Sequence, residues 1–349
     1  MRIVVLTNHF RPRGGLEKYT KRSSEELEKL GHEIHVIAPK EDGMYETSVE
    51  VHPIPLKCLK LSKHEYLYLL GNTVKKVVEE LKPDCVLVQG KWHSFYFDAV
   101  RYDMPRSVID HTHYPTTAYL RLVKKLFSKV LDYPMKFYHS IGRVYKTSGC
   151  EWVPGGVDEI GYSRDPPLNE DYILLFGRPV QQKGFHLFLE RVVPKLSEDV
   201  KIVLAGRGDF RWLKKYVPRR RENVIFLGEV SDPYTWMHHA RVVVFPSVAE
   251  GTPLSLLEAM KVESLIVARK LKTLEEILED SGFLAEDEAE MAEIINQVLE
   301  ERISGEHQRR LRKKAGELAS KYTWKNTAKR IEKLCLKAVA KYCDENGLL

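Results

Sequence analysis

Short apolar runs alternate with longer amphipathic stretches along this chain, and the alternation occurs in two separate series. Apolar runs of strand length that are separated by helical patterns are typical of βαβ units and parallel sheets. In the first series we expect strands near 2–7, 33–38, 49–54, 84–89 and 106–110, with helices near 16–30, 63–82 and 93–102. This pattern restricts the first half of the chain to an α/β fold.

The second series repeats the pattern and then ends in helices. Its expected strands lie near 172–177, 200–205, 223–227, 241–246 and 264–268, and its expected helices near 184–196, 209–217, 232–239, 253–261 and 273–279. Three longer helical stretches follow at about 286–302, 306–321 and 324–342. The two series together predict an α/β chain of two Rossmann-like, doubly wound domains.

A turn-rich stretch separates the two series. Residues 153–158 read VPGGVD, and two consecutive prolines follow at 166–167. At 349 residues the chain also exceeds a typical domain of roughly 150 residues. We therefore expect a first domain at 1–155 and a second domain that begins at 156, with a hinge between them.

Composition excludes several classes of protein. Hydrophobic residues make up 43% of the chain, but no apolar run approaches the roughly 20 residues of a membrane span. The first residues have the pattern of a strand with no secretory signal, so we expect a cytoplasmic protein. The five cysteines include no Cys-x-x-Cys pair, which argues against a disulfide framework or a zinc site.

Ligands of doubly wound folds bind at the carboxyl ends of the strands, so the loops expected there are the candidate ligand-binding segments. The loop after the first strand carries Gly14 and Gly15 directly before a helix. Glycines at that place let backbone amides approach a phosphate or a sugar. An ordinary strand-to-helix turn would have the same sequence, and the spacing is not that of a dinucleotide fingerprint.

In the second domain, Gly177-Arg178 closes the first expected strand and Lys183-Gly184 opens the next helix. A guanidinium can grip two phosphate oxygens and an ammonium adds a point charge, so the two cations together could stabilise a departing diphosphate. Each of them could equally be a solvated surface cation.

Residues 245–260 form the most specific stretch of the sequence. We expect Thr252 to cap a helix that has Pro253 at its first position, which would direct the positive end of the helix dipole toward a second phosphate. Glu258 on that helix could accept hydrogen bonds from vicinal ribose hydroxyls, and Glu250 before it could reach sugar hydroxyls. A loop carboxylate at Glu250 and a lysine partner for Glu258 are the structural alternatives.

The loop after the last strand of the first series contains His111 and His113. Histidines there could donate to a sugar hydroxyl or, together with a carbonyl, stabilise positive charge. A His-x-His pair also raises the possibility of a metal site, but no third ligand follows at suitable spacing.

These motifs resemble those of the retaining GT-B glycosyltransferases, in the large family 4-like, group 1 set with a Glu-x7-Glu motif. The resemblance covers nearly the whole chain. It rests on Gly14-Gly15-x-Glu17, on LGHEIHV at 30–36, on His111-Thr112, Pro154-x-Gly156-Val157-Asp158, Gly177-Arg178, Lys183-Gly184 and Ala205-Gly206-x-Gly208, and on the spacing of Glu250 and Glu258.

The resemblance implies roles for the candidate residues. It implies that Arg178 and Lys183 bind the donor diphosphate, that Glu258 binds the ribose and Glu250 the transferred sugar, and that His111 lies at the reacting centre. The backbone around the donor would come from Gly14, Gly15, Gly251, Thr252, Pro253 and Leu254. It also implies transfer with retention of anomeric configuration, with a nucleotide-sugar as co-substrate and with no cofactor or metal.

The resemblance further implies a division of labour between the domains. Domain 1–155 would bind the acceptor, and 156–325 would bind the nucleotide-sugar. A C-terminal helix at 326–349 would return to the first domain. Two turns depart from the family pattern, because 261–265 and 269–273 carry large or charged side chains where the family has small residues and glycines.

The segment 119–146 carries seven basic residues against Asp132 alone, interleaved with apolar and aromatic residues. This composition suits an anionic membrane surface or an acidic, lipid-linked acceptor, and a peripheral location on the inner face of the membrane. An ordinary solvated helix face has the same composition. Nucleic acid is not expected as a partner, because no binding module accompanies the charge.

Two other functions are compatible with the sequence. One is a nucleotide-sugar epimerase of the same fold. The other is a nucleotide-sugar-binding protein without turnover, which the altered turns at 261–265 and 269–273 would favour.

Overall fold

The computed structural model describes residues 1–7, 9–12, 14–55, 57–62, 65–69, 72–89, 104–110, 138–140, 151–219 and 221–347. The chain divides into two compact units. Unit 1 consists of Met1–Gly155 together with Trp324–Leu349, and unit 2 consists of Gly156–Thr323.

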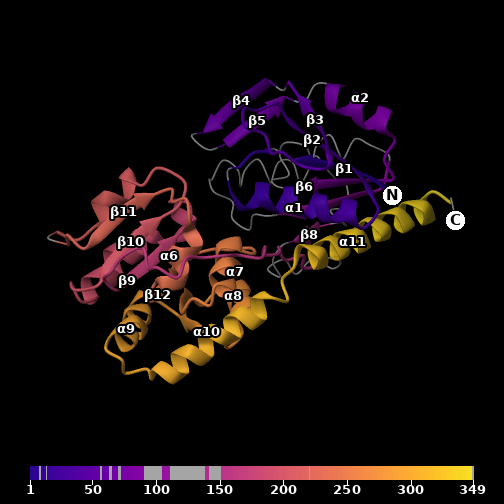
Figure 1. Ribbon diagram of the computed structural model, residues 1–349. Helices are drawn as coiled ribbons and strands as arrows, with labels where there is room; N and C mark the ends of the chain where they lie inside the picture. The colour runs from indigo at the N-terminus through magenta and orange to yellow at the C-terminus, as the bar shows by residue number, and fades with distance from the viewer. Residues whose placement is uncertain are drawn as a thin grey trace. The chain divides into compact units, whose positions relative to one another are not determined.

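Unit 1 contains a parallel sheet with the order β3-β2-β1-β6-β7-β8 among the described strands. The strands are β1 (Arg2–Thr7), β2 (Glu33–Pro39), β3 (Glu50–Ile54), β6 (Cys85–Gln89), β7 (Arg106–Asp110) and β8 (Tyr138–Ser140). Figure 1 shows α1 (Gly15–Lys29) on one side of this sheet and α2 (Asn72–Leu81) on the other. Helices on both faces bury both sides of the strands, which explains their nearly continuous apolar runs.

The face of the sheet toward α2 forms a compact apolar core. Val4 and Leu6 of β1 and Ile37 of β2 pack there with Val74 and Val78 of α2. Side chains two positions apart share one face of a strand, so the residues between them point to the opposite face.

One prediction of secondary structure was wrong in unit 1. The stretch expected as a helix at 63–82 begins as the second strand of an antiparallel pair, β4 (Lys57–Ser62) and β5 (Glu65–Leu69), and α2 starts only at Asn72. The sequence EYLYL of β5 alternates aromatic and apolar residues with a period of two, which favours a strand over a helix.

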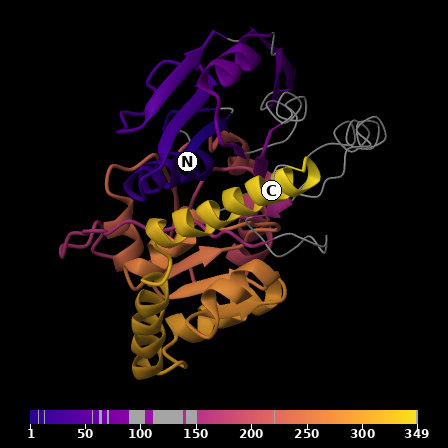
Figure 2. The ribbon, with the colours of Figure 1, turned by 90° about the vertical axis from the view of Figure 1, so that its right-hand side faces the viewer.

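The C-terminal helix α11 (Trp324–Glu345) belongs to unit 1. It packs against α1, β6 and β7, and Figure 2 shows it as one long, continuous helix. Trp324 at its start is buried and meets Tyr19 of α1 edge to face, with ring centroids 5.8 Å apart. Thr327 donates to the carbonyl of Pro154 at 2.9 Å. This bond connects the helix to the end of the segment Met1–Gly155.

Unit 2 contains a second parallel sheet, with the order β11-β10-β9-β12-β13-β14 among its described strands. These are β9 (Tyr172–Phe176), β10 (Lys201–Ala205), β11 (Val224–Gly228), β12 (Val242–Phe245), β13 (Ile266–Arg269) and β14 (Phe283–Ala285). The helices are α5 (Phe185–Leu187), α6 (Pro233–His239), α7 (Leu254–Lys261), α8 (Lys272–Leu278), α9 (Glu288–Leu299) and α10 (Gly305–Ala319). After α5 the backbone widens into a π turn at Phe188–Val192 and tightens into a 3₁₀ turn at Val193–Lys195.

A large apolar core fills one face of the second sheet. Ile173 of β9, Ile202 of β10 and Val242 of β12 face Phe188 and the buried residues of α9, such as Ile295. None of the described helices in either unit has the length and apolarity that a membrane crossing requires.

Both sheets have the strand order 3-2-1-4-5-6 of doubly wound folds when their parallel strands are numbered along the chain. In unit 2 the order reverses between β9 and β12, which are neighbours in the sheet. Loops that leave neighbouring strands in opposite directions open a crevice at the carboxyl ends, where ligands of such sheets bind. The loops after β9 and β12 are therefore the expected ligand-binding segments of unit 2.

Replacement of Trp324 tests how α11 is held. Its ring is buried, while its indole N–H has no hydrogen-bond acceptor among the described residues. We expect Trp324→Ala to lower the free energy of unfolding by about 3–5 kcal/mol, because it removes the ring from a packed contact. Trp324→Phe should cost much less, since it keeps an aromatic ring and removes the unpaired N–H. Guanidinium unfolding followed by circular dichroism measures both, and equal losses for the two variants would contradict this account.

Candidate functional site

Two loops of unit 2 lie against each other at the carboxyl ends of β9 and β12. The loop after β9 runs through Gly177 to Gly184, and the loop after β12 runs from Pro246 to Pro253. Gln182 joins them twice: its carbonyl accepts from the amide of Val248 at 2.9 Å, and its side-chain amide donates to the carbonyl of Ala249 at 2.9 Å. The loops are thus held by backbone groups as well as by side chains.

An ion pair between Lys183 and Glu250 lies at the centre of this arrangement. The Lys183 ammonium donates to Oε1 of Glu250 at 2.7 Å, and the hydroxyl of Ser247 donates to the same oxygen at 2.7 Å. The two charged side chains are 16% and 7% exposed. Charges this far from water are stabilised only when they are paired and hydrogen-bonded, and here both conditions are met.

Glycine is required at one position of the loop pair. Gly184 has φ +69, and a Cβ there would lie 1.9 Å from the carbonyl oxygen of Pro246. The two backbones can therefore approach only because this residue has no side chain. This close approach places Lys183 within reach of Glu250.

Arg178 follows β9 and behaves differently from Lys183. It is exposed, and among the residues that the structure describes no carboxylate forms an ion pair with it. Its guanidinium therefore keeps its five N–H donors for solvent or for a ligand.

The helix after β12 begins one residue later than the sequence predicts. Pro253 is the N-cap of α7 with ψ 110, and no side chain caps the helix, so the expectation of a Thr252 cap with Pro253 at the first helical position was wrong. The carbonyl of Pro253 accepts from the amides of Leu256 and Leu257 at 3.0 and 3.4 Å. The extended conformation of proline fits the N-cap position, and this moves the whole helix start by one residue.

Glu258 lies just over one turn into α7 and is buried. Glutamate side chains are usually exposed and are rarely buried unless they are paired.

Thr273, at the start of α8, donates to the backbone carbonyl of Glu250 at 3.1 Å and so connects a third loop to the site. Gly251, Thr252 and Leu254 lie on the short chain segment between the two glutamates.

Three cations in the two turns that depart from the family pattern form ion pairs. Lys261 donates to Glu159 at 3.0 Å. Arg269 forms an ion pair with Glu288, the first residue of α9, and Lys270 forms one with Glu286, two residues before it. These partners neutralise the added charge locally.

The candidates in unit 1 are only partly described. Gly14 is the N-cap of α1 with φ −177, an extended conformation open to any residue, and α1 begins at Gly15. Glu17 in the first turn of α1 is buried. His111 and most of the basic segment 119–146 lie outside the described residues, except that 138–140 form β8.

The structure brings together Lys183 and Glu250 and places Arg178 and Glu258 on segments next to them. The sequence motifs do not point to Ser247, Gln182 or Thr273, which position Glu250 and its loop. Ser247 could have been noticed, because it lies three residues before Glu250 in the most specific stretch. Nothing in the sequence indicates the contacts of Gln182 and Thr273, which depend on the packing of the loops.

Family models match both halves of the chain. The model described as glycosyl transferases group 1 matches residues 170–301, and the model described as glycosyltransferase family 4 matches residues 13–145. Together they cover the whole second sheet and every described strand of the first sheet except β1.

Curated relatives are similar over parts of their length. An uncharacterized glycosyltransferase of Methanocaldococcus jannaschii is 36% identical over 130 residues, which are 35% of this chain and 33% of that protein. The chain thus matches about one third of the length of this relative. A phosphatidyl-myo-inositol mannosyltransferase of Mycolicibacterium smegmatis is 25% identical over 298 residues, which are 76% of this chain and 75% of that protein.

Solved structures share the fold over nearly the whole chain. Sucrose-phosphate synthase from Thermosynechococcus elongatus has a TM-score of 0.74 and 16% identity, covering 97% of this chain and 99% of that one. Anabaena HepE, solved in complex with UDP and glucose, has a TM-score of 0.74 and 17% identity, covering 95% and 98%. At this level of identity the likeness concerns the fold.

Replacement of Gly184 by alanine tests the close approach of the two loops. We expect a loss of stability of at least about 1–3 kcal/mol from the left-handed backbone alone, with a further loss from the contact with Pro246. Gly161→Ala is the control, since no atom lies within 4 Å of its Cβ position and its φ is not in the left-handed region. Thermal unfolding measures the stability of both variants. A Gly184→Ala variant as stable as the Gly161→Ala control would contradict the close approach of the two loops.

Replacement of Lys183 tests the buried ion pair. Lys183→Met should cost about 3–5 kcal/mol, because Glu250 would remain buried without its cation. The double variant Lys183→Met/Glu250→Gln should recover most of that loss, since glutamine is neutral and can still accept from Ser247.

The exposed pair of Lys313 and Glu317 provides the control, and Lys313→Met should cost less than about 1 kcal/mol. Denaturant unfolding compares the three variants with the wild type. If the single and double variants at Lys183 unfold at the same denaturant concentration, the two charges are not coupled as described.

Proposed function

Because the chain belongs to the group 1 and family 4 glycosyltransferases and has the GT-B fold, we propose that it transfers a sugar from a nucleotide-sugar donor to an acceptor. The observation that carries this proposal is the buried pair of Lys183 and Glu250 at the point where the strand order of unit 2 reverses. Ligands of doubly wound sheets bind at such points.

Lys183 and Arg178 are proposed to hold the donor diphosphate. An ammonium has three N–H donors, and Glu250 uses one of them, so Lys183 can still donate to phosphate oxygens. Arg178 is exposed on the same loop and can grip two oxygens at once. As the bond to the sugar breaks, negative charge grows on the diphosphate, and two preorganised cations lower the energy of that state. In this proposal they take the part that a metal ion would otherwise have, and no cofactor takes part.

The two glutamates are proposed to recognise the sugars of the donor. Glu258 is held on a rigid helix and can accept two hydrogen bonds from the vicinal hydroxyls of the ribose. Glu250 is fixed by Lys183 and Ser247, and its second carboxylate oxygen can accept from a hydroxyl of the transferred sugar. Fixed acceptors of this kind orient the anomeric carbon, which contributes to rate through positioning. His111 is proposed to lie at the reacting centre.

We propose that transfer retains the anomeric configuration. The acceptor oxygen would attack from the side on which the diphosphate leaves, and a phosphate oxygen would take the proton of the acceptor hydroxyl. The bond from the anomeric carbon to the diphosphate breaks as the bond to the acceptor forms. Lys183 and Arg178 would stabilise the diphosphate throughout this step.

Two similar proteins support proposals for the donor and the acceptor. One solved structure, Anabaena HepE, holds UDP-glucose, and the M. smegmatis relative is a phosphatidyl-myo-inositol mannosyltransferase. We propose a lipid-linked acceptor for this chain, supported by the seven basic residues of 119–146, which would attract the chain to an anionic membrane surface.

Donor binding can be measured directly by calorimetry with UDP-, GDP- and ADP-sugars. One of them should bind the wild type, and Lys183→Ala and Glu258→Ala should each weaken that binding about 10- to 100-fold, the loss expected for one charge-assisted hydrogen bond. Lys214→Ala, on an exposed lysine of the same unit, should bind as the wild type does. Circular dichroism of each variant verifies that it is folded.

The reaction products then separate the alternatives. Transfer to an anionic lipid acceptor with an anomeric configuration equal to that of the donor supports the proposal, and an inverted product contradicts retention. Isomerised donor without any acceptor would indicate an epimerase. Donor that binds and is never cleaved, with any acceptor tested, would indicate a binding protein.

A further inference from the structure

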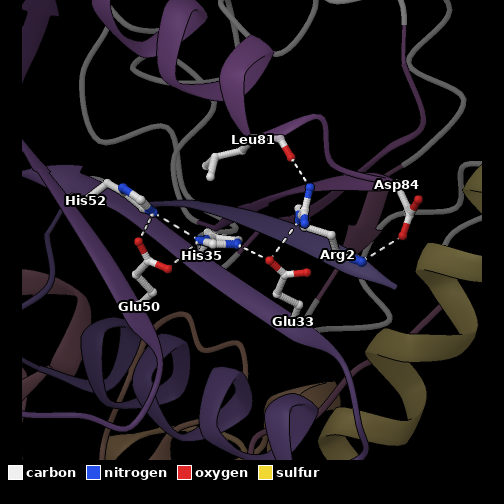
Figure 3. A network of polar contacts seen from close by, with 7 residues as sticks. All are labelled: Arg2, Glu33, His35, Glu50, His52, Leu81 and Asp84. Carbon is white, nitrogen blue, oxygen red and sulfur yellow. Dashed lines mark hydrogen bonds and ion pairs between the residues drawn. The ribbon is translucent and has the colours of Figure 1, made fainter.

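Two histidines and a glutamate come together on β2 and β3 of unit 1, toward the amino ends of these strands. His35 lies on β2, and Glu50 and His52 lie on β3. The strands are parallel, with His35 opposite Glu50. Residues two positions apart share a face of the sheet, so all three side chains lie on the same face. Figure 3 shows them pointing toward one another.

The atoms that could bind a metal ion are close together. Nδ1 of His35 lies 3.0 Å from Nε2 of His52. The two carboxylate oxygens of Glu50 lie 3.3 Å from Nδ1 of His35 and 3.4 Å from Nε2 of His52. Two ligand atoms at about 2.1 Å from a tetrahedral zinc ion are about 3.4 Å apart. The three separations therefore match the spacing of atoms that share one metal ion.

A second carboxylate orients His35. Nε2 of His35 lies 3.0 Å from Oε1 of Glu33, and Glu33 is itself paired with Nε of Arg2 at 2.9 Å. A carboxylate can only accept, so the proton of a neutral His35 ring resides on Nε2 and its lone pair on Nδ1. A metal-binding histidine typically donates its other N–H to a carboxylate in this way.

This orientation leaves an excess of acceptors at the centre of the cluster. The lone pair of His35 Nδ1 faces both the carboxylate of Glu50 and Nε2 of His52. A proton on His52 Nε2 would satisfy one of these contacts, but Nδ1 of His35 and the Glu50 oxygen would still be two acceptors in contact. His35 is only 5% exposed, so water offers little relief there. A cation at the centre resolves the conflict.

We propose that His35, Glu50 and His52 bind a divalent transition-metal ion, with Zn²⁺ as the best match to two imidazole nitrogens and a carboxylate. Glu50 is exposed, so a water molecule could reach the ion from that side as a further ligand. Glu33, which is itself paired with Arg2, orients His35 through the ring nitrogen that does not face the ion. Since the ion would join β2 to β3, which is an edge strand of the described sheet, it would stabilise the sheet and take no part in sugar transfer.

Metal binding is tested with the full chain, prepared without a polyhistidine tag and treated with a chelator. Titration with Co²⁺ should give visible absorption bands that saturate at one equivalent, and Zn²⁺ should displace them. Zn²⁺ should also raise the melting temperature by a few degrees, since an ion that binds only the folded state stabilises it. The variant His35→Gln/His52→Gln should lose the absorption bands and the shift.

The variant His307→Gln is the matched control, because His307 lies in unit 2, where its ring accepts from Arg310. It should bind the metal as the wild type does. If glutamine at both positions prevents folding, Glu50→Gln serves instead and should weaken Co²⁺ binding at least tenfold. The proposal fails if the wild type binds no more metal than the double variant, which would mean that a proton occupies the centre, or if His307→Gln removes the bands as well.

Discussion

The order of parallel strands in unit 2 determines where its chemistry can be. Lys183 and Glu250 are 67 positions apart in the chain, yet β9 and β12 are neighbours and their loops leave the sheet side by side. The ion pair between the two residues depends on this adjacency. It also depends on Gly184, whose missing side chain lets one backbone touch the other. A buried pair of charges gains little net stability when its desolvation is counted, so its value lies in fixing the position of Glu250.

Side chains next to the ion pair also fix the position of Glu250. Ser247 donates to the same carboxylate oxygen as Lys183, and Thr273 holds the backbone carbonyl of Glu250. Three loops from three different strands thus converge on one glutamate. A carboxylate held from several sides loses little entropy when a sugar hydroxyl binds to it, which is the physical basis of preorganisation.

Much of this architecture could be predicted from sequence, for reasons that particular residues illustrate. The apolar runs of β9 and β12 are short and continuous, as buried parallel strands must be. The Glu-x7-Glu spacing indicated Glu250 and Glu258, and both glutamates are buried in the structure, while their roles stay a prediction. The hairpin of β4 and β5 was missed because the two-residue alternation in EYLYL is short and a helical pattern follows it directly. The cap of α7 was misplaced by one residue, since proline is compatible with both the N-cap and the first helical position. The cluster of His35, Glu50 and His52 could not be predicted, because it depends on the register between two strands that the sequence does not specify.

The place of α11 in unit 1 has a consequence for the order in which the chain can fold during synthesis. Unit 2 is a single continuous segment, Gly156–Thr323, so all of its residues leave the ribosome before Trp324 does. Unit 1 begins first but lacks the helix that covers α1, β6 and β7 until the last part of the chain has emerged. The apolar residues of unit 1 that α11 covers therefore stay exposed to chaperones or to other nascent chains while unit 2 is synthesised. The first unit to be synthesised is the last to be completed.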